Sequence, residues 1–209
     1  MSSPSLVASM VRLAKTRLAA SLPTAPRTVS VKIRIHRDLA ATLAWVREVE
    51  AAGADYITVH GRTRSQRSST PPDLDAIAAV KAAVACPVVA NGDVFVPRDV
   101  QRIVGRTGVD GVMAARGLLE NPALFAGHER TPEACVRCFL GYAVRCPIPF
   151  PLVVHHLGEM MGRMEGMGKK GRKELMGCRD LVELVDWVEG RFGRGQGDGG
   201  EVEDSPEVD

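Results

Sequence analysis

A strand followed by a helix occurs four times in the first 127 residues, and this repetition limits the folds that are open to the chain. Each unit joins a short apolar segment to an amphipathic one. Strands that are apolar nearly throughout and alternate with helices are typical of a parallel sheet covered by helices. The sequence therefore predicts an α/β fold, with strands over Ser30–Ile35, Tyr56–His60, Pro87–Ala90 and Val109–Ala114.

The expected helices carry recognisable start and stop signals. Asp38 and Asp73 are placed to cap the helices that follow the first two strands. Pro97 stands where the first turn of a helix tolerates proline, and Gly53 is placed to end a helix. A further helix over residues 5–20 is expected before the first strand, because its apolar residues recur at helical spacing.

The pattern changes near residue 128, after which no strand is expected. Thr131–Glu133 opens a helix, and the segments Phe150–Met167 and Lys173–Phe192 have helical patterns. The last residues are rich in glycine and acidic side chains, a composition typical of disorder. The expected division is into a strand-containing part at 1–127, a small helical domain at 128–192 and a disordered acidic tail at 193–209.

The net charge of +2 conceals an uneven distribution along the 209 residues. Six acidic residues and no basic ones lie in residues 198–209, so the other 197 residues carry 27 basic and 19 acidic side chains, a net charge of +8. Such a balance favours polyanionic partners. The block from Arg163 to Lys173 has five basic residues against Glu165, which indicates either a phosphate-contacting patch or a solvated helix end.

Two features bear on the compartment. No run of 18 apolar residues occurs, so the sequence predicts no membrane span. Five cysteines are scattered through a chain without a secretory signal, which predicts free thiols in a reducing compartment. We expect a cytoplasmic protein, with the nucleus as the alternative.

Polar residues stand at the ends of the expected strands. Lys32, His60, Asn91 and Arg116 are 28, 31 and 25 residues apart, about one strand-helix unit each. In a parallel βα array the carboxyl ends of the strands converge on one face, where the chemistry takes place. The four residues predict a site for an anionic, planar cofactor, although by spacing alone His60 fits a structural role equally well.

The residues beside these positions support an anion site. Lys32 lies between Val31 and Ile33, where a lysine is costly unless it meets an anion or reaches solvent. Gly92 allows close approach of the backbone, and Arg116 supplies a fork-shaped cation.

Two other clusters have undecided roles. The spacing of Cys135 and Cys138, with Cys146 further on, resembles the start of a zinc site, but core thiols are the stronger interpretation. His155 and His156 fit helix packing or a polar network better than a metal face. We expect no metal.

Four segments together resemble the tRNA-dihydrouridine synthases, and the eukaryotic D-loop (20a/20b) branch is the most similar. The His155-His156-Leu157 run and the short helical domain also match that branch. The resemblance covers roughly residues 5–190. The segments are Val31–Arg34, Ile57–Thr63, Pro87–Asp93 and Asp110–Gly117, followed by Asn121-Pro122.

The resemblance implies an FMN-binding TIM barrel followed by a helical domain that grips tRNA. It implies reduction of a uridine C5–C6 double bond in the D-loop, with NADPH or NADH as reductant, and no DNA partner. The implied flavin contacts are Lys32 and His60, the implied phosphate cradle is Asn91, Gly92, Asp93, Ala115 and Arg116, and the implied substrate contacts are Arg34 and Arg62.

The chain departs from the family pattern in one respect. None of its cysteines follows an Asn-x-x-x-Gly-Cys-Pro motif, which carries the general acid of the family in the first half of the barrel. Four strands are expected where a (β/α)8 barrel has eight. We therefore expect the C-terminal half of a barrel, inactive alone, whose two exposed strand edges cause poor solubility or pairing with another half.

Two alternatives remain open. The chain could be a non-catalytic tRNA-binding remnant of that family, held to RNA by its helical domain and basic block. A phosphate-binding isomerase or aldolase shares the arrangement of polar strand ends, but it leaves the His-Gly-Arg-Thr and Asn-Gly-Asp runs unexplained.

Overall fold

The computed structural model describes residues 3–21 and 27–193. The chain divides into two compact units, Met1–Arg130 and Thr131–Asp209, which are described separately below. The expected acidic tail lies, apart from Gly193, outside the described residues.

The first unit is built on a parallel four-stranded sheet. Its strands are adjacent in sequence order: β1 (Ser30–Arg34), β2 (Tyr56–His60), β3 (Val88–Asn91) and β4 (Gly111–Met113). All three neighbouring pairs are parallel. The α/β class and the parallel sheet predicted from the sequence are confirmed, although β4 is shorter than expected.

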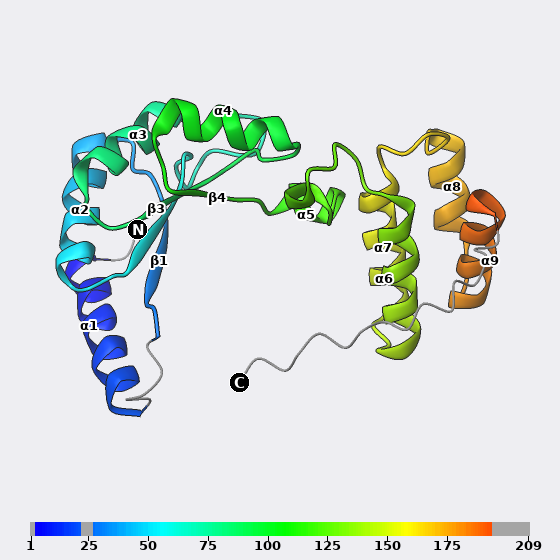
Figure 1. Cartoon of the computed structure of the whole chain (residues 1–209), viewed down its shortest axis with the longest axis horizontal. Coiled ribbons are helices and arrows are strands. Elements are labelled where there is room, and N and C mark those ends of the chain that lie inside the picture. The colour runs from blue at the N-terminus through cyan, green and yellow to red at the C-terminus, as the bar shows by residue number, and fades with distance from the viewer. Residues whose placement is uncertain (1–2, 22–26, 194–209) are drawn as a thin grey trace. The chain divides into compact units, whose positions relative to one another are not determined.

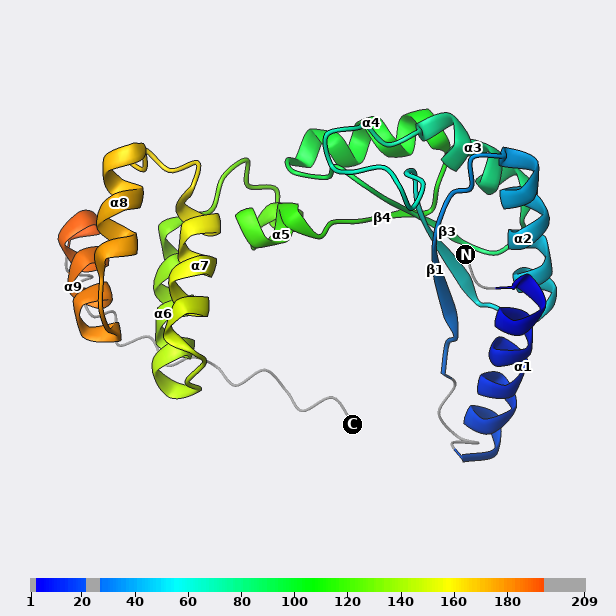
Figure 2. The ribbon, with the colours of Figure 1, turned by 180° about the vertical axis from the view of Figure 1, so that it is seen from behind.

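Four helices form a row over one face of the sheet. They are α1 (Pro4–Ser21), α2 (Leu39–Ala51), α3 (Leu74–Ala83) and α4 (Pro97–Thr107), and each packs against the next (Figures 1 and 2). Because side chains alternate along a strand, one set of residues from each strand enters the layer beneath the helices. This core includes Ile33, Ile57, Val59, Val88 and Ala90 of the strands and Trp45, Val46, Ile77 and Val80 of the helices.

The helix starts follow the predicted signals. Asp38 Oδ1 accepts a hydrogen bond from the Ala40 amide at 3.0 Å, and Asp73 Oδ1 accepts one from the Ala76 amide at 2.8 Å. Each carboxylate satisfies a backbone donor that the helix itself leaves unpaired. Pro97 is the first residue of α4, as expected.

None of these four helices lies over the opposite face of the sheet. Toward the amino ends of the strands this face has an apolar hollow of about 620 Å³, whose lining includes Tyr56, Val89, Val112, Met113, Leu118 and Phe125. Toward the carboxyl ends the same face carries polar residues.

Two short elements follow β4 that the sequence analysis did not predict. They are α5 (Arg116–Glu120) and a 3-10 turn over Leu124–Ala126. Gly117 brings α5 against the preceding loop, since a Cβ at this residue would lie 1.9 Å from the Val94 carbonyl oxygen. The backbone of Arg116 is thereby held beside the loop that follows β3.

The described part of the second unit, residues 131–193, has four helices around a core of its own. They are α6 (Glu133–Arg145), α7 (Phe150–Met161), α8 (Lys169–Gly177) and α9 (Leu181–Phe192). The core includes Val136, Leu157, Met161, Leu175 and Leu184. No helix among residues 3–21 and 27–193 is long and apolar enough to cross a membrane.

Two of the predicted helix ranges in this unit were wrong. The segment expected to run as one helix to Met167 stops at Met161, and Gly166 has a positive φ of 74° that a helix does not allow. The segment expected as one helix over Lys173–Phe192 is two, because Asp180 begins α9 by accepting a hydrogen bond from the Glu183 amide at 2.9 Å. Cys138 is exposed, so its predicted place in the core was also wrong.

Candidate cofactor and substrate site

The carboxyl ends of the strands bring polar side chains of the first unit together. Pairing in the sheet sets Arg34 beside His60, His60 beside Asn91 and Asn91 beside Met113. Lys32 stands two residues before Arg34 on β1, so it lies on the same face of the sheet. Its Nζ donates a hydrogen bond to Asn91 Oδ1 at 2.6 Å. Asn91 Nδ2 in turn donates to the Met113 carbonyl oxygen at 2.8 Å, so a polar chain runs from β1 to β4.

Lys32 is exposed, because the face of the sheet to which it belongs has no covering layer in the first unit. Partial burial and the nearby Arg34 guanidinium lower the pKa of the Lys32 amine from its ordinary value. The side chain therefore reaches solvent, which is one of the two alternatives stated for it. The Lys32 amine can still contribute to an anion site, because its hydrogen bond to Asn91 holds it near the strand ends.

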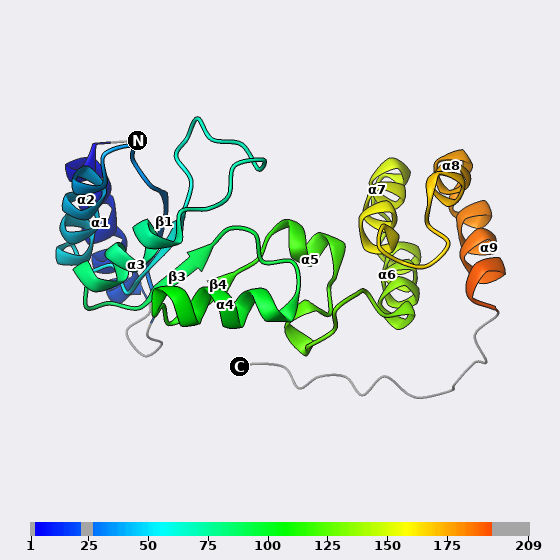
Figure 3. The ribbon, with the colours of Figure 1, turned by 90° about the horizontal axis from the view of Figure 1, so that it is seen from above.

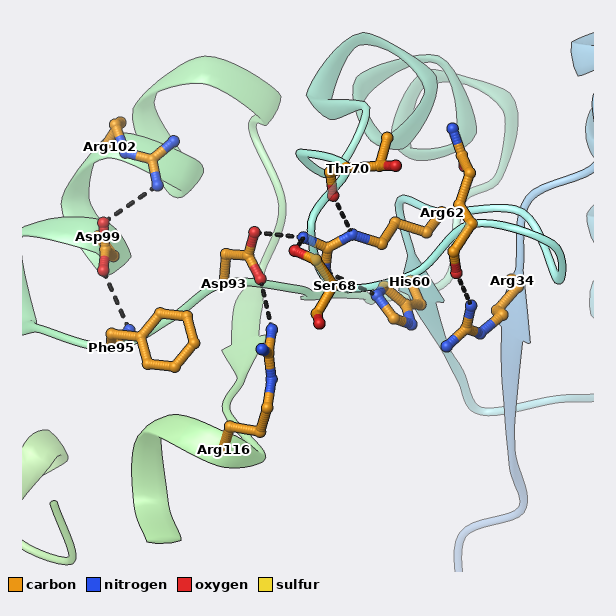
Figure 4. Close-up of polar contacts among 11 residues, drawn as sticks. Arg34, His60, Arg62, Ser68, Thr70, Asp93, Phe95, Asp99, Arg102 and Arg116 are labelled. Carbon is orange, nitrogen blue, oxygen red and sulfur yellow. Dashed lines mark hydrogen bonds and ion pairs between the residues drawn. The ribbon is translucent and has the colours of Figure 1, made fainter. Parts of the chain in front are cut away.

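Arg62 is almost fully buried, with 3% of its side chain exposed. Its guanidinium donates to the carbonyl oxygens of Thr70 and Ser68 and forms an ion pair with Asp93 (Figure 4). The other carboxylate oxygen of Asp93 accepts a hydrogen bond from Arg116 Nη2 at 2.9 Å. Asp93 thus joins a buried arginine to one that is half exposed.

The Arg34 guanidinium also donates hydrogen bonds to backbone carbonyl oxygens. Its Nη1 donates to the carbonyl oxygens of Thr63 at 2.9 Å and Gln66 at 3.2 Å. Gln66 Oε1 accepts a hydrogen bond from the Thr63 amide at 2.7 Å. Arg34 and Arg62 were expected to contact substrate, but both guanidinium groups hold the loop between β2 and α3, which projects from the rest of the unit (Figure 3).

His60 lies among cations at the end of β2. Burial, followed by the charges of Arg34, Lys32 and Arg62, lowers its pKa to about 4, while Asp93 opposes the shift. The imidazole is therefore neutral at neutral pH and can accept or donate one hydrogen bond at each ring nitrogen, according to its tautomer.

Glycine is required beside this histidine. Gly92 has a φ of 134°, and a Cβ there would lie 3.1 Å from Pro72 Cβ and 3.4 Å from His60 Cδ2. The next residue, Asp93, also has a positive φ, of 51°. The sharp turn after β3 therefore exposes backbone rather than side chain at the strand end.

A cavity of about 70 Å³ lies at the ends of β2, β3 and β4. The Arg116 guanidinium at its edge is 50% exposed and lies over the Phe95 ring, 5.1 Å from the ring centre (Figure 4). Six of the residues predicted from the sequence to contact cofactor line this cavity: His60, Asn91, Gly92, Asp93, Ala115 and Arg116. The remaining one, Lys32, reaches it only through Asn91.

A second cavity, of about 280 Å³, lies under the projecting loop. It is lined by Arg34, His60, Arg62, Arg64, Gln66, Arg67, Ser68 and Arg116. Arg64, Gln66 and Arg67 were not predicted from the sequence to line a ligand site. The alternation of basic and small polar residues directly after the Gly61-Arg62-Thr63 turn was the signal that could have identified them.

Known proteins resemble the chain over most of its length. Residues 1–183 match the family model described as Dihydrouridine synthase (Dus). The tRNA-dihydrouridine(20a/20b) synthase (NAD(P)+) of Schizosaccharomyces pombe is 45% identical over 90% of this chain and 56% of its own length. The Saccharomyces cerevisiae protein of the same name is 41% identical over 90% of this chain and 50% of its own.

A human protein named tRNA-dihydrouridine(20a/20b) synthase (NAD(P)+)-like is 38% identical over 91% of this chain and 58% of its own. Among solved structures, a dihydrodipicolinate synthase from Agrobacterium tumefaciens is 16% identical over 91% of this chain and 67% of its own, with a TM-score of 0.43, which is too low to carry an argument. The chain spans about half the length of these curated relatives. The family match over residues 1–183 shows that this chain belongs to the dihydrouridine synthase family.

Proposed function

We propose that this chain is the cofactor-holding part of a tRNA-dihydrouridine synthase, which reduces a uridine C5–C6 double bond in the tRNA D-loop with FMN and NADPH or NADH. The observation that carries the proposal is the cavity of about 70 Å³, where an exposed arginine and the backbone turn at Gly92 meet at adjoining strand ends. The names of the matched relatives support the reaction and the nicotinamide reductant.

The described residues fit the phosphate of FMN. Arg116 presents a half-exposed fork of donors, and the turn at Gly92 and Asp93 brings backbone to the wall of the same cavity. We assign Asn91, Gly92, Asp93, Ala115 and Arg116 to the phosphate, with Asp93 acting through Arg116.

We assign Lys32 and His60 to the flavin ring system. The bound cofactor would supply the hydride for reduction of the uridine. Lys32 is held beside Asn91 by its hydrogen bond, so its positive charge is fixed near the strand ends before any ligand arrives. A fixed cation stabilises negative charge that develops on a ligand during reaction, without reorganisation.

The open face of the sheet and the edges of β1 and β4 are where we propose that further βα units pack and complete a barrel. In the part of the chain that the structure describes, each of these two strands pairs on one side only. An unpaired edge beside an apolar hollow of about 620 Å³ is an unfavourable surface in water. Relatives about twice as long are consistent with this arrangement.

The second unit offers a surface for tRNA. Lys169, Lys170, Arg172 and Lys173 are all exposed in the first half of α8. Positive side chains in the first turn of a helix are unfavourable because the helix dipole is positive there as well. We propose that a phosphate backbone offsets this repulsion, and that both units therefore contribute to RNA binding.

The test is the visible spectrum of the complete protein that contains this chain, purified with and without the substitution Arg116→Gln. We expect absorption near ~450 nm, typical of an oxidised flavin, and a loss of most of the bound flavin in the variant. Formation of dihydrouridine in unmodified tRNA should depend on NADPH or NADH. A colourless protein that binds tRNA in a salt-sensitive way would favour the non-catalytic alternative instead.

A further inference from the structure

We propose that Arg64 and Arg67 bind a backbone phosphate of the RNA substrate next to the uridine that is reduced. The inference rests on the proposed function for the identity of the polyanion. Both side chains are exposed, and both line the cavity of about 280 Å³ under the projecting loop.

Hydrogen bonds to its backbone fix the loop that carries these two arginines. Arg34 holds the carbonyl oxygens of Thr63 and Gln66, and Arg62 holds those of Ser68 and Thr70. Arg64 and Arg67 therefore extend from a backbone tied down on either side of each of them. A preordered loop loses little conformational freedom when it binds a ligand, so the binding energy of its exposed side chains is retained.

The excess of positive charge in the cavity of about 280 Å³ favours the binding of an anion in addition to the cofactor. Five of its eight lining residues are arginines and none is acidic. Asp93, at its border, pairs with Arg62 and Arg116, so one negative charge opposes five positive ones. A cofactor phosphate on Arg116 would compensate part of the excess, but Arg64 and Arg67 would still face the cavity without a carboxylate.

The exposure of Arg64 and Arg67 on a projecting loop favours a polymer over a second small ligand (Figure 3). Guanidinium groups suit phosphodiesters because two parallel N–H donors match two phosphate oxygens.

A nicotinamide phosphate is the competing ligand with the same chemistry. Relatives with 41–45% identity are named for NAD(P)+, which covers cofactors with and without a 2′-phosphate. A strongly basic pocket dedicated to that phosphate would discriminate between the two cofactors. The observations therefore favour RNA.

The experiment measures the affinity of the complete protein that contains this chain for unmodified tRNA at several salt concentrations. We expect the double substitution Arg64→Gln, Arg67→Gln to weaken binding about tenfold and to reduce the salt slope by about one for each arginine. The matched control is Arg47→Gln, an exposed arginine on α2 far along the chain from the loop, which should change the affinity less than twofold. Substitution of both loop arginines by lysine should restore the salt slope and most of the affinity, which a structural role would not.

Several results would overturn the inference: a complete wild-type protein without salt-sensitive tRNA binding, a double variant with unchanged affinity and slope, or a variant that loses NADPH affinity and keeps RNA binding. Circular dichroism of the double variant checks that it is folded, and the lysine variant decides the matter if it is not. Flavin content and uridine reduction by the complete protein test the proposed function separately, because they do not enter these binding measurements.

Discussion

At the scale of single residues, Asp93 is the most constrained position of the site. It has a positive φ of 51°, and its two carboxylate oxygens pair with Arg62 and Arg116. Arg62 depends on this carboxylate because its guanidinium is almost removed from water. A buried charge without its partner is strongly destabilising.

We expect Asp93→Asn to lower the free energy of unfolding by about 2–3 kcal/mol, because it removes the charge that compensates Arg62. Asparagine tolerates a positive φ as well as aspartate does, so the backbone is not the cause. Urea unfolding of the two proteins measures the difference. The control is Asp75→Asn, which breaks an exposed pair with Arg106 and should cost less than about 0.5 kcal/mol. Equal effects of the two substitutions would contradict this account.

His60 gives a prediction for pH. Its pKa is about 4 in the folded chain, against 6.5 for an ordinary histidine. Between these values the unfolded chain binds more protons, so the free energy of unfolding falls as the pH is lowered from about 6.5 to about 4. We expect the His60→Gln protein to lose less stability over this range than the wild type does. The ring protons of His60 followed by NMR should titrate near pH 4, and a midpoint near 6.5 would show that burial and the neighbouring cations do not lower its pKa.

Residue types at the strand ends could be predicted from the sequence, but their partners could not. The spacing of His60, Asn91 and Arg116 placed them at one edge of a parallel sheet, and they line one cavity there. The contacts of Arg34 and Arg62 could not be predicted, because a guanidinium can donate hydrogen bonds to a loop carbonyl as well as to a ligand. Whether it binds the loop or a ligand depends on the path of residues 61–73, and no local sequence pattern determines that path.

At the scale of elements, the short helix α5 shows how one glycine positions the site. The Val94 carbonyl oxygen occupies the place of a Gly117 side chain, so the loop after β3 and the helix after β4 are packed backbone against backbone. This contact keeps Asp93 within reach of Arg116.

We expect Gly117→Ala to destabilise the chain by about 2–3 kcal/mol, because the added methyl group can be accommodated only by a shift of the backbone. Gly105→Ala is a matched control within α4, since a Cβ there meets nothing within 4 Å. Alanine is the better helix former, so this control should raise stability by roughly 0.5–1 kcal/mol. Thermal unfolding of both variants measures the two effects, and a Gly117→Ala protein as stable as the wild type would refute the packing argument.

Elements with strong end signals were predictable and those without them were not. Asp38, Asp73 and Pro97 begin helices where the sequence placed them. The division between α8 and α9 was missed because Asp180 interrupts an apolar pattern that continues across it. The five-residue α5 was missed because it is too short to show a period.

At the scale of the whole molecule, the sheet of the first unit is covered by a layer of helices on one face only. The other face has an apolar hollow of about 620 Å³. In the described chain, β1 and β4 each pair with a neighbouring strand on one side only. Unpaired strand edges are templates for association.

We expect the 209-residue chain to self-associate or precipitate when purified alone, because its edges and hollow are then open to water. Sedimentation velocity over a range of protein concentrations measures this directly. Addition of a polypeptide that supplies the remaining βα units should suppress it. A monodisperse monomer with a single cooperative melting transition would show that the open face needs no partner.

The carboxylate shared by Arg62 and Arg116 links the two cavities at the strand ends. An incoming phosphate that attracts Arg116 would leave Asp93 wholly to Arg62, the arginine that fastens the backbone at Ser68 and Thr70. A phosphate in the cavity of about 70 Å³ would then strengthen the ion pair that holds the loop over the cavity of about 280 Å³. Under the proposed function, cofactor binding would therefore assist RNA binding.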